Sequence, residues 1–415
     1  MEQSFLKGKT ASPNLGVAFD WFEKVSLESC LRRSRNGTAM VLCVLGLGTP
    51  LAADEVAPRP GDDGGAVGVV EEEASRWTLH GFLNLAWGQT DGAKYRGVDE
   101  DGTGDLRNAA LQLRYQVSKS DEIVVQLAHE NVGTSPTNQF REEVEFDWFF
   151  WSHEFEQGTR LRVGRVPLPI GIYNEIKDVG TALPFYRPSG NFYGEGTWTS
   201  DSVDGLVLSH TFRESKPWSV VVDGYYGSWE RIETDGSTLR FGEAQIDEAL
   251  GIHAWLESPS GAFRVGVGVN EFEASEGLFL APGVTDEEQT RYFSLQAGGE
   301  KVRFNFELSR REFTGGYWQP YYAELLIRPV PRFQIGLLYD VGHLLFEIPF
   351  FATFDDQIEE LFGIGLAWEA RHNLVLKLEH QWVEGFGQIE DRPLNIFFDQ
   401  PLDVNLLLAS ASYSF

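Results

Sequence analysis

The 415-residue sequence is poor in sulfur, with only two cysteines and two methionines. Both cysteines, Cys30 and Cys43, lie near the N-terminus, so the rest of the chain cannot form disulfide bonds. The chain also lacks an apolar run of the ~18 residues that a membrane-spanning helix requires. The sequence therefore predicts neither a disulfide framework nor a transmembrane helix.

Positive charge is scarce as well, because 34 Lys and Arg stand against 62 Asp and Glu, a formal net charge of −28. Such an acidic chain is repelled by polyanions, so we expect no nucleic-acid partner. The sequence shows no H-E-x-x-H pair, no P-loop and no G-x-S-x-G elbow. We therefore expect no cofactor and no enzymatic activity. The alternative of a β-barrel lipase or protease would need a Ser–His–acid set on one external face.

The N-terminal region 1–53 is predicted to be an extension followed by a secretory signal peptide. Three arginines precede the apolar run 39–52, which suits the hydrophobic part of a signal, and cleavage is expected near Ala53. A buried core helix is the alternative. Residues 54–76 are rich in Pro, Gly and acids and are predicted to be a flexible acidic spacer.

From Trp77 to Phe415 the chain alternates apolar and polar residues, as where Leu83 and Leu85 flank Asn84. Alternation with period two over about ten residues predicts β-strands. The predicted strands are 77–87, 109–117, 121–130, 142–151, 159–166, 201–212, 217–229, 246–258, 262–272, 290–298, 301–313, 318–329, 332–341, 358–370, 373–384 and 404–415.

The connections after the even-numbered strands are short, and those after the odd-numbered strands are long. Eleven tryptophans lie at or near predicted strand ends, where interfacial girdles occur. An even strand count with short turns on one side and long loops on the other is typical of a membrane barrel, because lipid tolerates no unpaired backbone groups. The fold class is thus predicted as all-β, a transmembrane antiparallel up-and-down barrel of sixteen strands over 77–415. A soluble secreted β-rich protein is the alternative.

The chain ends on "LLLASASYSF", with Phe415 last. This ending resembles the C-terminal signature of Gram-negative outer-membrane barrels, which the barrel-assembly machinery reads. Together with the signal peptide and the strand layout, it makes the chain similar to porins. The resemblance implies Sec export to the outer membrane, contact with its lipid and lipopolysaccharide, and passive diffusion of small hydrophilic solutes or ions through a water-filled homotrimeric channel.

A second stretch carries a narrower resemblance. "GRVPLPIGIYNEIKDVG", from Gly164 to Gly180, is similar to a segment of porins related to phosphate-selective porins, although Lys177 stands where arginine is commoner. A substrate-selective anion channel is therefore a second expectation. In the porins that the chain resembles, the third external loop follows strand five, folds inward and narrows the pore.

The connection after the fifth predicted strand, 167–200, is the longest of all. Its prolines end the strand and stiffen the loop. The resemblance implies that it constricts the pore, and the alternative is an external loop that packs on its neighbours or on a trimer partner. The candidate constriction residues are Tyr173, Asn174, Glu175, Lys177, Asp178 and Arg187 in the connection, and Glu143, Glu145, Asp147, Arg160, Arg162 and Arg165 on the two preceding strands.

Acids that face bases across a narrow aqueous pore create a transverse field that sorts solutes by charge. The alternative is mutual neutralisation that stiffens the wall. Further inward-facing candidates on later strands are Arg264, Arg303, Arg311, Arg328, Lys377 and Glu379.

Asp99, Asp101 and Asp105 resemble the start of a calcium loop. The twelfth position is Ala110, so the bidentate glutamate is missing. We predict a solvated acidic loop and no bound metal, with weak divalent binding as the alternative.

Overall fold

The structure is a computed structural model that describes residues 76–141, 144–155, 158–194, 201–212, 217–235, 239–278, 280, 284–348 and 352–415. The predicted signal peptide and nearly all of the predicted spacer lie outside these residues, and the expectations for them stay predictions.

Sixteen strands form the described part of the chain. They are β1 (Trp77–Asp91), β2 (Thr103–Gln116), β3 (Asp121–Val132), β4 (Glu145–Phe155), β5 (Thr159–Pro167), β6 (Ser202–Phe212), β7 (Ser219–Asp235), β8 (Arg240–Glu257), β9 (Phe263–Glu276), β10 (Asp286–Gly298), β11 (Val302–Phe313), β12 (Gly316–Val330), β13 (Phe333–Ile348), β14 (Ala352–Arg371), β15 (Leu374–Gly385) and β16 (Leu402–Ser414). Three short helices accompany them: η1 (Pro136–Phe140), η3 (Asn174–Ile176) and α4 (Gly190–Tyr193).

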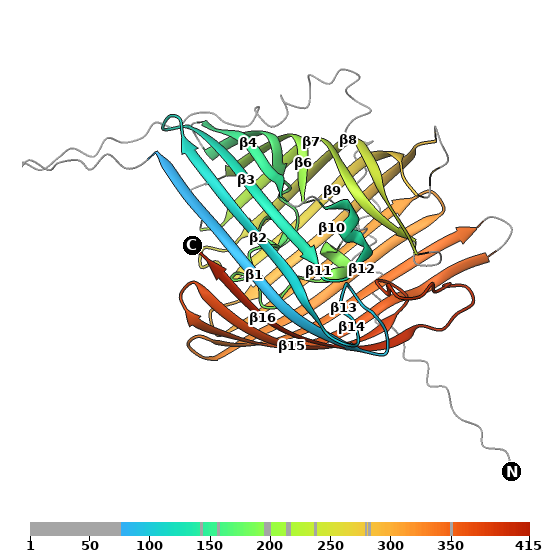
Figure 1. Cartoon of the computed structure of the whole chain (residues 1–415). Helices are drawn as coiled ribbons and strands as arrows, with labels where there is room; N and C mark the ends of the chain where they lie inside the picture. The colour runs from blue at the N-terminus through green and yellow to red at the C-terminus, as the bar shows by residue number, and fades with distance from the viewer. Residues whose placement is uncertain are drawn as a thin grey trace, which may run out of the picture. The chain divides into compact units, whose positions relative to one another are not determined.

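The strands form one closed barrel in which every strand pairs antiparallel with its sequence neighbours and β1 closes on β16 (Figure 1). The predicted fold, an all-β up-and-down barrel of sixteen strands, is therefore confirmed. Within the described residues, no helix has the length and apolar character needed to cross a bilayer.

The C-terminal residue takes part in the closure. The backbone N–H of Phe415 donates to the carbonyl of Gly81 at 3.0 Å, and the N–H of Gly81 donates back to Phe415 at 3.0 Å. A Cβ atom at Gly81 would lie 2.5 Å from the Phe415 ring. Gly81 thus makes room for the terminal aromatic ring at the seam.

The predicted alternation holds on most strands. In β1, Leu79, Leu83 and Leu85 are exposed on the outer face, whereas Phe82 and Asn84 are buried inside. The tryptophans follow the same parity rather than forming one girdle. Trp77, Trp87, Trp151, Trp218, Trp368 and Trp382 are exposed, but Trp229 and Trp255 are only 4% exposed. The prediction that nearness to a strand end assigns tryptophan to an interfacial girdle is wrong for these last two.

Several strands are longer than predicted on the side of the long connections. β8 begins at Arg240 rather than at 246, β13 ends at Ile348 rather than at 341, and β14 begins at Ala352 rather than at 358. Backbone pairing continues past the part of each strand that has alternating apolar residues, because water does not prevent hydrogen bonds between strands. The alternation marks only that part, so the predicted strands were too short and the predicted connections too long.

Strand β4 departs from the predicted parity. The ladder pairs Gln126 with Trp148 and Leu127 with Phe146, so Asp147 is the extra residue of a β-bulge. Phe146 and Phe149 are exposed on the outer face, whereas Phe150 packs toward the buried interior. Because a bulge reverses the alternation, Trp148 and Phe150 face the interior, whereas an uninterrupted alternation with Glu145 and Asp147 inside would have placed them outside.

Candidate functional site in the barrel interior

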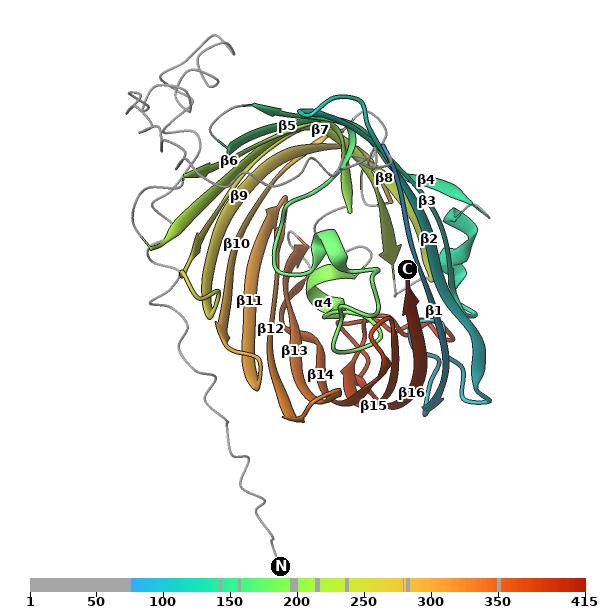
Figure 2. The same ribbon diagram turned by 90° about the vertical axis from the view of Figure 1, so that its left-hand side faces the viewer.

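The long connection between β5 and β6 spans residues 168–201, of which 168–194 and 201 are described. We call residues 168–194 the β5–β6 segment. Figure 2 shows this segment, including α4, within the ring of strands. Its side chains Leu168, Ile170, Phe185 and Phe192 are buried together with side chains of the barrel wall.

Charged side chains of the wall bond to the main chain of the segment. Glu307 of β11 accepts the N–H of Ile172 at 3.0 Å, and Glu379 of β15 accepts the N–H of Tyr186 at 2.5 Å. Lys377 of β15 donates to the carbonyl of Phe185 at 2.6 Å. Wall groups thus satisfy backbone groups that a buried loop would otherwise leave unpaired.

Two buried tyrosines of the segment make matching contacts with the same wall. The Tyr173 hydroxyl donates to Glu324 of β12 and accepts from Asn305 of β11 at 2.8 Å. The Tyr193 hydroxyl donates to Glu307. The segment is therefore bonded to β11, β12 and β15 through side chains as well as main chain.

Its residues 177–181 reach the opposite wall. Asn84 of β1 donates to the carbonyl of Asp178 at 2.6 Å, and Asn108 of β2 donates to the Asp178 carboxylate at 2.8 Å. Thr181 bonds to Ser414 of β16 at 3.2 Å. The segment thus crosses the interior from one wall to the other.

Burial and ionic contacts shift the pKa values of Lys177 and Asp178, which lie where the segment crosses the interior. Burial raises the pKa of the Asp178 carboxyl to about 6, against the opposing effect of Lys177. Burial lowers the pKa of the Lys177 ammonium, but Asp201 and Asp178 outweigh it and leave this pKa raised. Lys177, paired with Asp201, therefore stays charged at neutral pH. The Asp178 carboxyl, with a pKa of about 6, changes its protonation just below neutral pH.

Two cavities adjoin the segment, with wall residues mainly from β1 to β5 and, for one of them, also from β7. The loop-end cavity, of about 270 Å³, is lined by wall residues such as Asn84 and Glu130, by Lys177 and Asp178, and by the β15–β16 connection at Glu390. The turn-end cavity, of about 410 Å³, is lined by β2 to β5, by the short turn at Lys119 and by Glu175. Both are polar spaces next to the crossing segment.

The two cavities differ in charge. The described lining of the loop-end cavity has seven carboxylates and five cations, whereas that of the turn-end cavity has four cations and three carboxylates. One end of the interior is thus acidic on balance and the other basic.

Most of the candidate constriction residues lie at these cavities. Glu145, Asp147, Lys177, Asp178 and Arg187 line the loop-end cavity, and Arg160, Arg162 and Glu175 line the turn-end cavity. Arg187 bonds to Glu130 at 3.1 Å, and Arg162 bonds to Glu175 at 3.1 Å.

The remaining candidates lie elsewhere. Tyr173 and Asn174 are buried in the contacts of the segment, Asn174 donating to the carbonyl of Leu168 at 3.0 Å. Glu143 lies outside the described residues.

Arg165 does not line either cavity, and its assignment to the constriction is corrected. Gly164, at φ +132°, pairs with Phe150, and Arg165 pairs with the exposed Phe149. The guanidinium lies 5.7 Å from the Phe149 ring and bonds to Asp204 at 2.8 Å. Because cross-strand partners share a face, Arg165 belongs to the outer surface of the wall.

Sequence reasoning missed Glu130 and Arg141, which form an ion pair of 2.6 Å at the loop-end cavity. The parity of β3 places Glu130 on the same face as Gln126, so this residue could have been found. Arg141 lies in a connection, where no periodicity assigns a direction.

The calcium-like loop contains no ion site in the described residues, which hold no group of three or more His, Cys, Asp or Glu arranged for a metal. Asp105 pairs with Arg107, and the carbonyl of Asp99 accepts the N–H groups of Thr90 and Gly102, each at 3.2 Å. These contacts are the hydrogen bonds and ion pair of a turn between β1 and β2.

One Ser–acid–His contact occurs among the described residues. Ser118 bonds to Asp121 at 2.5 Å, and His153 bonds to the same carboxylate at 2.8 Å. The acid lies between the other two groups, whereas activation of a serine requires the imidazole next to the hydroxyl. This set caps the short turn between β2 and β3.

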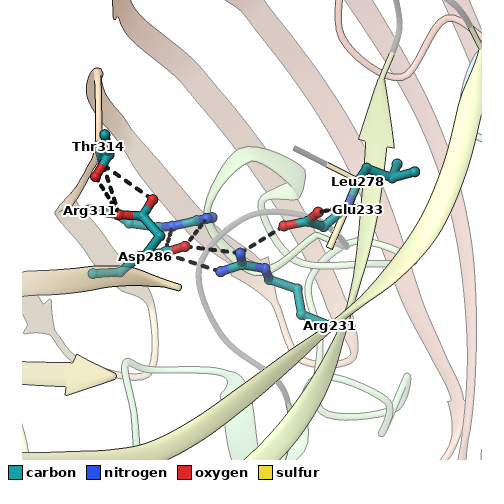
Figure 3. Close-up of polar contacts among 7 residues, drawn as sticks. Arg231, Glu233, Leu278, Asp286, Arg311 and Thr314 are labelled. Atoms are coloured by element: carbon teal, nitrogen blue, oxygen red, sulfur yellow. Dashed lines mark hydrogen bonds and ion pairs between the residues drawn. The ribbon is translucent and has the colours of Figure 1, made fainter. Parts of the chain in front are cut away.

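A buried ionic cluster lies at the loop end of the wall, and its Arg231 also lines the loop-end cavity (Figure 3). Arg231 of β7 bonds to Glu233 at 2.8 Å and to Glu288 of β10 at 3.1 Å, and Arg311 of β11 bonds to the same Glu288 at 3.0 Å. Glu233 also accepts the N–H of Leu278 at 2.9 Å. The cluster thus links β7 with β10, which are not neighbours in the barrel, and β10 with β11.

No family model and no curated protein matches the sequence. Solved structures do match the fold. The outer membrane channel DcaP of Acinetobacter baumannii is similar with a TM-score of 0.53 at 10% identity, over 82% of this chain and 97% of that chain. An anion-selective porin from Comamonas acidovorans gives 0.52 at 11% identity, over 82% and 99%. A trimer form of OmpT, an outer membrane protein of Vibrio cholerae, gives 0.52 at 10% identity, over 82% and 99%.

Proposed function

We propose that this chain is an outer-membrane porin that lets small hydrophilic solutes and ions diffuse passively through a water-filled channel. The closed sixteen-stranded barrel with polar cavities next to the β5–β6 segment carries this proposal. A barrel exposes apolar side chains outward and needs no transmembrane helix, which suits lipid surroundings.

The proposed path runs between the β5–β6 segment and the inner faces of β1 to β5. It enters through the loop-end cavity, passes the narrow point at Asp147, Lys177 and Asp178, and leaves through the turn-end cavity. In this proposal the segment is the third external loop folded inward. Its bonds to β11, β12 and β15 support a fixed constriction rather than an external loop.

Further parts of the proposal rest on the sequence and on the similar structures. The chain is exported by the Sec pathway with cleavage near Ala53, and the assembly machinery recognises Phe415. It resides in a Gram-negative outer membrane, in contact with lipid and lipopolysaccharide, as a homotrimer. The trimer form of OmpT supports this last point.

Planar-bilayer recording of the purified protein tests the proposal. We expect stepwise, ohmic conductance increments and a finite reversal potential in a salt gradient. Protein that is folded, by heat-modifiable migration on gels, but that yields no conductance steps would refute the porin function.

A further inference from the structure

The turn-end cavity is polar, but two aromatic side chains lie among its arginines, which is unusual for the lumen of a membrane barrel. Trp148 and Phe150 line this cavity because the bulge at Asp147 turns them inward. Val124, the cross-strand partner of Phe150, is 1% exposed. On β5 the partner of Phe150 is Gly164, which adds no side chain. Trp148 and Phe150 thus form an aromatic patch within a cavity lining that is otherwise mostly polar.

Arginines stand on both sides of this patch. The register places Arg114 of β2 opposite Val124, in the same row as Phe150. Arg162 of β5 lies opposite Ser152, one row closer to the turns. Both arginines and both aromatic residues line the same cavity.

Two buried donor atoms at this patch lack a hydrogen-bond partner among the described residues, although Arg162 also bonds to Glu175 at 3.1 Å. Within the described residues, the buried Nε of Arg162 and the buried Nε1 of Trp148 have no hydrogen-bond partner. The Arg114 guanidinium donates from Nε to Gln112 at 2.7 Å, and its Nη1 lies 3.8 Å from Glu122, too far for a hydrogen bond. Buried donors without acceptors are costly, so the site favours an incoming acceptor, which small side-chain rotations would bring within reach.

We infer that the turn-end cavity binds a small aromatic carboxylate. The ring would stack on Phe150 and Trp148, and the carboxylate would lie toward Arg114 or Arg162, whose planar guanidinium matches its two oxygens. This inference deepens the proposed function, on which it rests, by naming a solute class that the channel retains during passage.

Titration calorimetry of the detergent-solubilised protein with sodium benzoate tests the inference. Acetate, which lacks the ring, and benzyl alcohol, which lacks the charge, are the comparison ligands. We expect saturable benzoate binding at least about tenfold tighter than that of either comparison ligand, because each lacks one of the two contacts.

Matched variants locate the site. Phe150→Leu and Arg114→Gln should each weaken benzoate binding about tenfold or less, through loss of ring stacking and of a charged hydrogen bond respectively. Phe149→Leu, the neighbouring residue on the outer face, and Arg328→Gln, an arginine of β12 that does not line the cavity, should leave it unchanged. Circular dichroism checks that all four variants fold.

The inference would be overturned if acetate or benzyl alcohol bound as tightly as benzoate. It would also be overturned if Phe149→Leu and Phe150→Leu lost the same amount of benzoate affinity. The calorimetry does not depend on conduction. Current without benzoate binding would refute the site alone, and binding by a protein that passes no current would refute the porin function alone.

Discussion

Both sides of the barrel interior carry charged side chains, but these side chains make different contacts on the two sides. On the side of β11 to β15, the glutamates Glu307, Glu324 and Glu379 are 0–2% exposed, and each bonds to the β5–β6 segment. On the side of β2 to β5, Arg114, Arg160 and Arg162 line a cavity instead. An inward-facing charge in a barrel therefore serves either as an anchor or as a lining, and the long connection decides which.

The largest expected effect comes from removing an anchor. Glu307 accepts hydrogen bonds from Ile172, Tyr193, Tyr322 and Ser294. Glu307→Ala leaves these buried donors unsatisfied and should lower the free energy of unfolding by ~3 kcal/mol or more. Urea unfolding in lipid vesicles, followed by tryptophan fluorescence, measures this.

Glu312→Ala on the same strand is the control, because that side chain is 43% exposed and its ion pair among the described residues is with Arg310. Its cost should stay below ~1 kcal/mol. Equal losses in the two variants would show that Glu307 is not an anchor.

A smaller effect is expected where the segment packs on the wall. A Cβ atom at Gly365 would lie 2.7 Å from the buried Phe185 ring, whereas one at Gly363, two residues earlier on β14, would meet nothing closer than 3.5 Å. Gly365→Ala should cost ~1–3 kcal/mol through overpacking and loosen the segment, which raises open-channel current noise. Gly363→Ala should do neither. Indistinguishable current noise in the two variants would argue against a segment that rests on β14.

The smallest effect concerns selectivity. Because the pKa of Asp178 is raised to about 6, its carboxylate is lost as the pH falls below that value. The channel should therefore become less cation-preferring between pH 7.5 and pH 5, with a shift of a few millivolts in reversal potential. The raised pKa also means that ionisation of Asp178 opposes folding, so this group destabilises the protein as the pH rises through 6.

Asp178→Asn should reproduce the low-pH reversal potential at neutral pH and remove its step near pH 6. Glu100→Gln, on the β1–β2 connection outside both cavities, should keep the wild-type profile. An unchanged step in Asp178→Asn would assign the titration to another group.

The barrel itself could be predicted from the sequence, because each strand records its surroundings in its own alternation, as Leu83, Asn84 and Leu85 do in β1. The same pattern identified Arg160 and Arg162 as inward-facing, and both line a cavity. Local periodicity is sufficient where no bulge interrupts the alternation of the strand.

Local periodicity was insufficient where a residue depends on a distant one. The bulge at Asp147 reverses β4, and only the pairing with β3 reveals it. Lys377 and Glu379 are inward-facing, as predicted, but they bond to Phe185 and Tyr186, almost two hundred positions earlier in the chain, and line neither the loop-end nor the turn-end cavity. No spacing within one strand encodes such a contact.

Thiol modification of channels in a planar bilayer tests the contrast between the two sides most directly. Gln112→Cys places a thiol at the turn-end cavity, and Leu338→Cys places one on β13, where the side chain is 4% exposed. A charged methanethiosulfonate reagent should reduce the current stepwise in Gln112→Cys and leave Leu338→Cys unaffected. Rapid block of Leu338→Cys together with an unreactive Gln112→Cys would place the path on the other side and contradict the account.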